Sequence, residues 1–239
     1  MGIMLKRFPL LALLAVLALH ASAKDAWKKE PYFDAKEIDY VALIPEPPAL
    51  KSPADQKELD DIVTVQKTLT DDQRAHIKLE ASYNTYDIFE DVLGSWFAKE
   101  NADKLPAMKR LLKREADTTS GVMIAAKDHW KRLRPYVKDA RIHSPIGAVD
   151  GWSYPSGHSM RATVDSLVLA QLDPAASEGI TMRGVRVGED RVRAGVHFET
   201  DVVSGRVLGK AIFAKLMATP EFQTDLAEAK AEVAVELKP

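Results

Sequence analysis

The sequence predicts an all-α protein built as a single-domain helical bundle, and three observations support this fold class. Helix start signals recur along the chain: Ser52 stands directly before Pro53, and Thr70 stands three residues before Gln73. Prolines fall between the predicted helices, where they end or begin a helix without kinking one. The sequence contains no convincing run of alternating β-branched residues, which would have predicted strands.

The predicted helices follow one another from Ser52 onward. Ser52 as an N-cap and Pro53 as the first helical residue predict a helix over 53–68. The start signal at Thr70 and the apolar spacing that follows predict one helix continuing to Gly94. Further helices are predicted over 106–118, 125–133, 158–172, 175–193, 201–218 and 220–237.

The first 23 residues have the pattern of a signal peptide. Lys6 and Arg7 form a short positive region, residues 10–19 are apolar, and an Ala-Ser-Ala run ends at Ala23. Cleavage after Ala23 would export the mature chain, which predicts a location in the periplasm or in the medium. An uncleaved N-terminal anchor is the alternative interpretation of the same residues.

The remainder of the chain divides into a proline-rich arm over 24–52, expected to lie extended on the surface, and a helical domain over 53–239. A formal charge of −2 gives no general attraction to nucleic acid. No second apolar run reaches membrane-spanning length, so we expect no stable membrane association after signal cleavage. The absence of cysteine excludes disulfides, Cys–zinc sites and thiol nucleophiles.

Three separated stretches hold the side chains that phosphoryl transfer without a metal requires. A transferring phosphoryl group spreads negative charge over its oxygens, and side chains must then neutralise that charge. Arg134 and Arg191 are the candidates, because a guanidinium binds two oxygens at once, and Lys127 adds a point charge. Lys127 and Arg134 are seven residues apart, which predicts that they share one face of a helix.

Ser156 and Gly157 are predicted to bind phosphate where a loop enters a helix. Free backbone N–H groups and the positive end of the helix dipole favour an oxyanion there. Gly157 removes the side chain that would keep the backbone away from the ligand. Ser156 taken alone is equally a helix N-cap, and Trp152 and Tyr154 beside it are candidates for the pocket wall or for the core.

Two histidines divide the expected chemistry. We assign His197 as the nucleophile and His158 as the general acid, since one must attack phosphorus unprotonated and the other must protonate the leaving alcohol. Asp201 follows His197 by four residues and reaches its second ring nitrogen if a helix begins there. That contact would hold the tautomer and stabilise the positive charge that forms on attack.

These stretches resemble the signature of the type-2 phosphatidic acid phosphatase (PAP2) and vanadium haloperoxidase superfamily: Lys-x6-Arg-Pro, Pro-Ser-Gly-His, and Ser-Arg-x5-His-x3-Asp. The chain supplies Lys127, Arg134 and Pro135, then Pro155 to His158, then Arg191, His197 and Asp201. Nearly all of the chain after residue 23 resembles the class A bacterial non-specific acid phosphatases. The resemblance implies a helical bundle of the PAP2/haloperoxidase type.

The same resemblance implies a metal-independent acid phosphatase that hydrolyses many phosphomonoesters through a covalent phosphohistidine. It implies no metal and no cofactor, a periplasmic location, small-molecule substrates and a chain compatible with a homodimer. A vanadate-dependent haloperoxidase is the main alternative, although those enzymes are usually much longer. A soluble lipid phosphatase is a further option.

One residue departs from the signature. Asp190 stands where the family has the serine before the third-motif arginine. A carboxylate there would draw the guanidinium of Arg191 aside or weaken its charge. This departure bears on catalytic strength and keeps a catalytically weak, phosphate-binding relative as another alternative.

Overall fold

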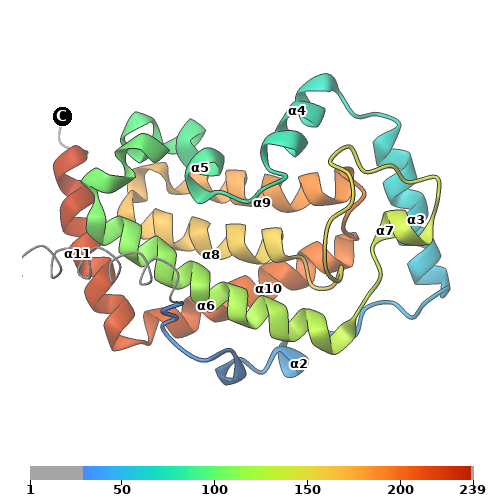
Figure 1. Ribbon diagram of the computed structural model, residues 1–239, viewed down its shortest axis with the longest axis horizontal. Coiled ribbons are helices and arrows are strands. Elements are labelled where there is room, and N and C mark those ends of the chain that lie inside the picture. The colour runs from blue at the N-terminus through green and yellow to red at the C-terminus, as the bar shows by residue number, and fades with distance from the viewer. Residues whose placement is uncertain (1–28, 238–239) are drawn as a thin grey trace, which may run out of the picture. The chain divides into compact units, whose positions relative to one another are not determined.

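The computed structural model describes residues 29–237, and all regular structure within them is helical (Figure 1). The predicted all-α class is therefore confirmed. Residues from 31 onward form one unit. The predicted signal peptide lies outside the described residues. Within residues 29–237, no helix combines the length and apolar character needed to cross a membrane.

The central helix is α8 (Gly157–Leu172), whose apolar residues are almost all buried. It contacts α6 (Pro106–Trp130), α9 (Ser177–Arg193) and α10 (Glu199–Met217), and α11 (Pro220–Glu236) crosses one end of this group (Figure 1). A helix that is apolar around most of its circumference must be covered on all sides. The bundle is therefore organised around α8.

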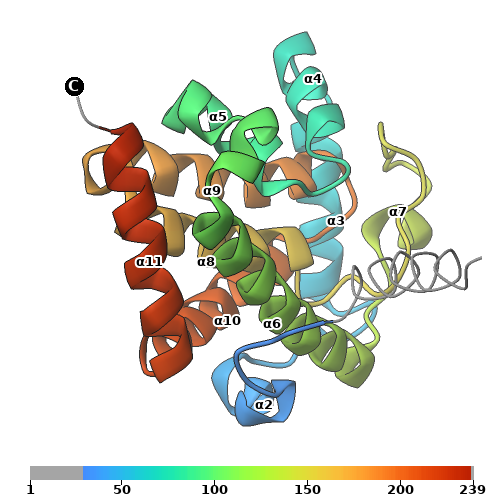
Figure 2. The same cartoon turned by 60° about the vertical axis from the view of Figure 1, so that its left-hand side comes forward.

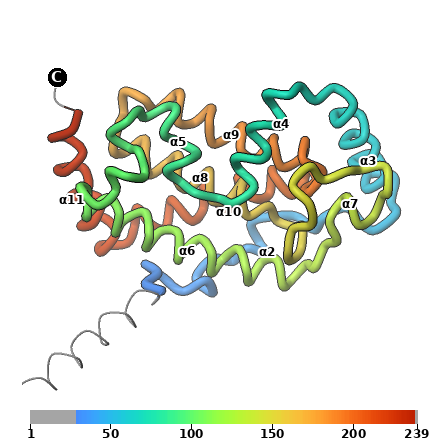
Figure 3. Tube along the Cα trace, turned by 45° about the horizontal axis from the view of Figure 1, so that its top comes forward, coloured from blue at the N-terminus to red at the C-terminus, as the bar shows by residue number. Residues whose placement is uncertain are grey.

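Shorter helices gather at the end of the unit away from α11. Helices α3, α4 and α7 lie there in both views (Figures 1 and 2), and the chain between α6 and α8 passes through α7 on its way back (Figure 3). The remaining helices are α2 (Tyr40–Leu43), α3 (Pro53–Gln66), α4 (Asp71–Leu79), α5 (Thr85–Leu93) and α7 (Pro135–Lys138), with the 3₁₀ turns η2 (Ala35–Glu37), η3 (Ser95–Phe97), η4 (Lys99–Lys104) and η5 (Pro174–Ala176).

Helices α8 and α10 approach each other closely because glycines line the contact. A Cβ atom on Gly205 would lie 2.6 Å from the carbonyl oxygen of Ser156, and one on Gly209 would lie 2.8 Å from that of Met160. Side chains larger than hydrogen would therefore push the two backbones apart. The close approach holds the N-terminus of α8 beside the N-terminus of α10.

Two helix predictions differ from the structure. The helix predicted over 70–94 is two helices, because α4 ends at Leu79 and Asn84 caps a new helix, α5. The helices predicted over 106–118 and 125–133 are one helix, α6, which ends at Trp130, where Lys131 adopts a left-handed conformation with φ 49°. Buried residues between the two predicted segments, such as Val122, pack against the core and keep α6 continuous.

The arm is less extended than predicted. It includes η2 and α2, and Phe33 and Ile44 are buried in the main core. The hydroxyl of Tyr32 donates to Asp225 on α11 at 2.6 Å, and the hydroxyl of Tyr154 donates to the carbonyl of Pro45 at 2.5 Å. The part of the arm from residue 31 is thus tied to the bundle by buried side chains and by hydrogen bonds.

Candidate active site

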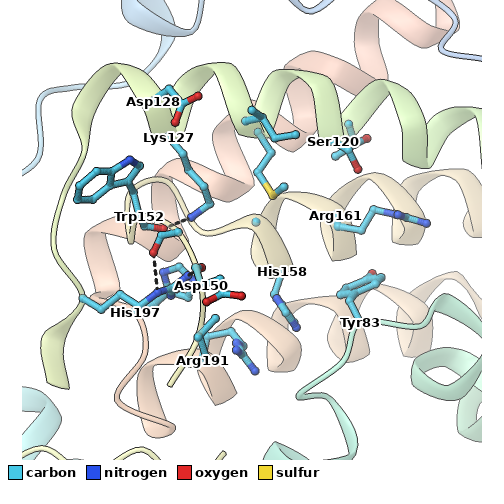
Figure 4. A pocket seen from close by; sticks show the side chains of 17 residues that line it. Tyr83, Ser120, Lys127, Asp128, Asp150, Trp152, His158, Arg161, Arg191 and His197 are labelled. Carbon is cyan, nitrogen blue, oxygen red and sulfur yellow. Dashed lines mark hydrogen bonds between the residues drawn. The ribbon is translucent and has the colours of Figure 1, made fainter. Parts of the chain in front are cut away.

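A cavity of about 480 Å³ opens where α6, α8 and α9 converge (Figure 4). Six of the eight predicted site residues line it: Lys127, Arg134, Gly157, His158, Arg191 and His197. The other two, Ser156 and Asp201, are fully buried beside it. The structure therefore brings the three sequence stretches together at one place.

Arg191 is a buried cation on the cavity wall. It projects from α9 with 1% of its surface exposed, and none of its three guanidinium nitrogens has a hydrogen-bond partner among the described residues. Burial, together with the nearby charge of Arg134, lowers the pKa of Arg191 to about 10. A buried charge is stable only when it is paired, so this geometry favours an anion in the cavity.

Arg134 is held by backbone carbonyl groups. Its Nε donates to Gly151 at 3.0 Å, and its two terminal nitrogens donate to Val196 at 2.9 Å and Asp150 at 2.8 Å. The predicted face shared with Lys127 is wrong, because α6 ends before Arg134, which has extended backbone angles. Tertiary packing therefore brings Lys127 and Arg134 to the same cavity, although they do not lie on one helix.

Lys127 adds a second cation beside Arg134. Its Nζ donates to the carbonyl oxygens of Trp152 and Ser153, the latter at 3.2 Å. Withdrawal from water, then repulsion by Arg134, lowers the pKa of Lys127 to about 7. Carbonyl partners orient the amine without neutralising it, so the wall stays positively charged in acid.

His197 and Asp201 form a buried pair. The helix α10 begins at Glu199, which places Oδ2 of Asp201 3.1 Å from Nδ1 of His197. A carboxylate accepts the Nδ1–H, so Nε2 carries the lone pair, and that nitrogen lies 3.3 Å from Arg134. Burial lowers the pKa of His197 to about 3, with Lys127 adding to the effect and the bond to Asp201 opposing it.

Two residues that the sequence analysis did not select also hold Asp201. The hydroxyl of Ser153 donates to Oδ2 at 2.5 Å, and Arg132 donates to Oδ1 at 2.6 Å. Burial raises the pKa of Asp201, but the bonds from His197 and the charge of Arg132 outweigh it and hold the pKa at about 2. Both residues stand within or beside the quoted motifs, but their role depends on tertiary contacts that spacing does not predict.

His158 lies in the first turn of α8. Its Nε2 is 2.9 Å from the backbone carbonyl oxygen of Glu80, which can only accept, so this nitrogen carries hydrogen. The edge of its ring meets Tyr83 at a centroid distance of 5.3 Å. Burial, followed by the charge of Arg191, lowers the pKa of His158 well below its ordinary value.

Ser156 and Gly157 begin α8 in different roles. Ser156 caps the helix, because its side-chain oxygen accepts from the backbone N–H of Ser159 at 3.4 Å, and it does not appear on the cavity wall. Gly157 does line the cavity, and a Cβ atom there would lie 2.3 Å from the sulfur of Met123. Absence of a side chain at Gly157 leaves room for Met123 over the first turn of α8.

Trp152 and Tyr154, which flank the second motif, have different places: one is on the pocket wall and the other is in the core. Trp152 lines the cavity, whereas Tyr154 is fully buried with its hydroxyl bonded to Pro45. Asp190 accepts from Arg193 at 2.7 Å and makes no hydrogen bond to the guanidinium of Arg191. Within the described residues, no group of three or more His, Asp or Glu side chains is placed to hold a metal ion.

Comparison with known proteins identifies relatives. The family model described as "PAP2 superfamily" matches residues 118–225, which include all eight predicted site residues. A non-specific acid phosphatase of Providencia stuartii is 28% identical over 209 residues, covering 84% of this chain and 83% of that protein. One from Salmonella typhimurium is 34% identical over 152 residues, covering 61% of this chain and 59% of that protein.

A solved structure, that of a transmembrane PAP2-type phosphatidylglycerolphosphate phosphatase from Bacillus subtilis, is 23% identical with a TM-score of 0.47, covering 72% of this chain and 89% of that chain. The relatives confirm the predicted resemblance and the prediction that the chain is an enzyme of the phosphatase class. Residues 118–225 thus resemble the PAP2 superfamily, and the chain is similar to bacterial non-specific acid phosphatases.

Proposed function

We propose that this chain is a metal-independent acid phosphatase that hydrolyses phosphomonoesters through a covalent phosphohistidine on His197. The observation that carries the proposal is the buried guanidinium of Arg191, which faces the cavity with no partner among the described residues. Nε2 of His197 borders the same cavity beside Arg134. A bound phosphate would pair these cations and place its phosphorus near the nucleophile.

In the first step, the lone pair on Nε2 of His197 attacks phosphorus and the bond from phosphorus to the leaving oxygen breaks. Arg134, Arg191 and Lys127 neutralise the charge on the non-bridging oxygens as it develops. His158 gives its proton to the leaving oxygen, and the proton comes from Nδ1 because Nε2–H is bonded to Glu80. The products are a free alcohol and phosphorylated His197.

In the second step, water attacks phosphorus and the bond from phosphorus to Nε2 breaks. The neutral His158 accepts the proton of the attacking water and returns to its starting state. Asp201 accepts a hydrogen bond from Nδ1–H of His197 in both steps. This bond holds the tautomer and stabilises the positively charged ring between the two steps. Inorganic phosphate is then released.

The proposed substrate class is broad. The cations that would bind the phosphoryl group are grouped around the nucleophile, and they recognise phosphate in any phosphomonoester. We include export to the periplasm in the proposal, on the pattern of the first 23 residues.

The test is an assay with p-nitrophenyl phosphate from pH 4 to 8 in excess EDTA. Turnover should persist in EDTA and fall by roughly 10³-fold or more in His197→Ala, because a lost covalent nucleophile removes most of the acceleration. His143→Ala is the matched control, since that histidine is exposed and outside the cavity lining. Absence of turnover in the parent, with vanadate-dependent halide oxidation instead, would favour the haloperoxidase alternative.

A further inference from the structure

The carboxylate of Asp201 has a second charged partner, Arg132, on the side away from His197. Arg132 follows the end of α6 and is only 7% exposed. Its Nη1 donates to Oδ1 of Asp201 at 2.6 Å and to the hydroxyl of Thr200 at 2.8 Å. The guanidinium carbon also lies 3.7 Å from the centroid of the Phe198 ring. These contacts hold Arg132 in one orientation beside the carboxylate.

Helix α3 anchors the other half of the guanidinium. Nη2 of Arg132 donates to Glu58 at 2.7 Å and to Asp55 at 3.5 Å, and both carboxylates belong to α3. Asp55 has a further partner in Lys138. Arg132 therefore connects α3 to Asp201 through direct ion pairs, and its position does not depend on bound substrate.

The two oxygens of Asp201 consequently bind two different partners with opposing effects on His197. Oδ2 accepts from Nδ1 of His197, and Oδ1 accepts from Arg132. The other charged or titratable groups that border His197 are Lys127 from α6, Arg134 before α7, His158 from α8 and Arg191 from α9. Asp201 is the carboxylate bonded to His197, and a cation shared with that carboxylate weakens its support for a positively charged ring.

We propose that Arg132 is a positioning residue that, through Asp201, keeps the phosphohistidine on His197 reactive. It orients the carboxylate so that Oδ2 meets Nδ1, and its charge limits how strongly Asp201 stabilises the phosphorylated ring. Phosphorylated His197 is then a better leaving group when water attacks, and the phosphoenzyme does not accumulate. This inference rests on the proposed function and adds a residue that lies in an unspecified position of the Lys-x6-Arg-Pro signature.

The lowered pKa of His197 agrees with this arrangement. A histidine bonded to a buried carboxylate ordinarily becomes more basic, yet the pKa of His197 is lowered to about 3, with burial the largest cause. Arg132 is among the groups that keep Asp201 ionised and its pKa low. Removing the charge of Arg132 should therefore make His197 more basic.

The test measures phosphoenzyme in Arg132→Met. Rapid mixing with an excess of p-nitrophenyl [³²P]phosphate, quenched in alkali to preserve phosphohistidine, gives the phosphorylated fraction and the size of the p-nitrophenol burst. We expect the phosphorylated fraction at steady state to rise severalfold and the acid limb of kcat/KM to move up by about one pH unit. Arg132→Lys keeps a cation without the two-sided contact, and its values should lie between those of the parent and of Arg132→Met.

Lys138→Met is the matched control. Lys138 also pairs with Asp55, and its amine lies 4.9 Å from the centroid of the same Phe198 ring, but its ion pair is with Asp55 and not with Asp201. It should keep the phosphorylated fraction and the acid limb of the parent. Equal loss of activity in the Lys138 and Arg132 variants, with both readouts unchanged in Arg132→Lys, would overturn the inference and leave Arg132 a structural residue. A parent enzyme without His197-dependent turnover would overturn the proposed function itself.

Discussion

Three cations meet around one cavity, and the charge environment of each side chain follows from that placement. Lys127 and Arg191 have pKa values lowered to about 7 and about 10, in both cases because of burial first and Arg134 second. The same surroundings lower the pKa of both histidines. Without an anion, the site keeps its histidines neutral, and a phosphate dianion would partly reverse this.

The pH dependence should reflect these shifts. Catalysis requires His197 neutral and His158 protonated, and the pKa of His197 is about 3, so the acid limb of kcat/KM should lie near that value. Because the pKa of His158 is lowered, its protonated fraction falls as pH rises, and kcat/KM should fall on the acidic side of neutral. A bound phosphate dianion favours protonated His158, so the alkaline limb of kcat should lie at higher pH than that of kcat/KM. Steady-state profiles from pH 2 to 9 measure both limbs, and a rate that climbs steadily into alkali would contradict the assigned roles.

Asp190 should reduce catalytic efficiency less than its departure from the signature implies. Its carboxylate pairs with Arg193 at 2.7 Å, and the ion pair is partly open to solvent on the Arg193 side. Replacing it by the family residue in Asp190→Ser should therefore change kcat/KM by no more than about fivefold. Asp190→Asn, which keeps the shape, serves as the comparison. A gain of tenfold or more in Asp190→Ser would show that this carboxylate does restrain Arg191.

Among the helices, those with local start and stop signals were predicted well. Ser52 and Ser156 cap α3 and α8, and Pro220 begins α11, as each local pattern indicates. Predictions failed where tertiary packing decides. Separate helices were predicted over 106–118 and 125–133, yet α6 continues through the residues between them because Val122 there is buried in the core.

The same limit applies to the site. Motif spacing predicted the site residues whose residue type and spacing indicate a chemical role, such as His197 and Asp201. Arg132 and Ser153 act by holding Asp201 from the sides, and nothing in their spacing distinguishes them from other polar residues. The shared face of Lys127 and Arg134 was inferred from a helix that in fact stops at Trp130.

The contact between α8 and α10 should tolerate no added methyl group at Gly205. The Cβ of Gly205→Ala would meet the carbonyl oxygen of Ser156 at 2.6 Å, so the backbones must separate beside the site. We expect a loss of about 1–3 kcal/mol in the free energy of unfolding, and a lower kcat/KM because the start of α8 moves.

Gly121→Ala on α6 provides the control for this substitution. A Cβ atom at position 121 would have the Cβ of Ala35 as its nearest neighbour, at 3.5 Å, which is an ordinary van der Waals contact. Alanine in a helix interior should then stabilise the protein by about 0.5–1 kcal/mol. Urea unfolding of both variants measures the difference, and equal effects of the two substitutions would contradict a close α8–α10 contact.

For the molecule as a whole, the bundle stabilises an arrangement of charge that is unfavourable on its own. Lys127 is carried by α6, Arg134 by the residue before α7, and Arg191 by α9, so three separate elements must pack before the cations meet. The buried carboxylates nearest to them are already paired with other groups, as Asp190 is with Arg193. Catalytic capacity and stability are therefore opposed at this site.

Removing Arg191 should consequently stabilise the phosphate-free protein. Its folded-state pKa is lowered to about 10, so folding disfavours the charged form, and this penalty is fully present at every pH below about 10, including pH 5 to 8. Arg191→Met removes the charge without orphaning an acceptor, because its guanidinium bonds to none of the residues in 29–237. We expect a higher Tm and a gain of roughly a few kcal/mol in the absence of phosphate.

Inorganic phosphate should make the parent protein more stable than Arg191→Met, which reverses the order expected without phosphate. The parent gains about 2.7 kcal/mol at a phosphate concentration one hundred times Kd, whereas Arg191→Met should gain much less because it has lost a phosphate ligand. Arg193→Met on the same helix is the control, since Arg193 pairs with Glu189 and Asp190 and does not line the cavity; its response to phosphate should match that of the parent. Thermal unfolding with a phosphate titration measures all three proteins. A phosphate-free Arg191→Met protein that melts below the parent, with an undiminished response to phosphate, would show that Arg191 serves the fold and not the anion.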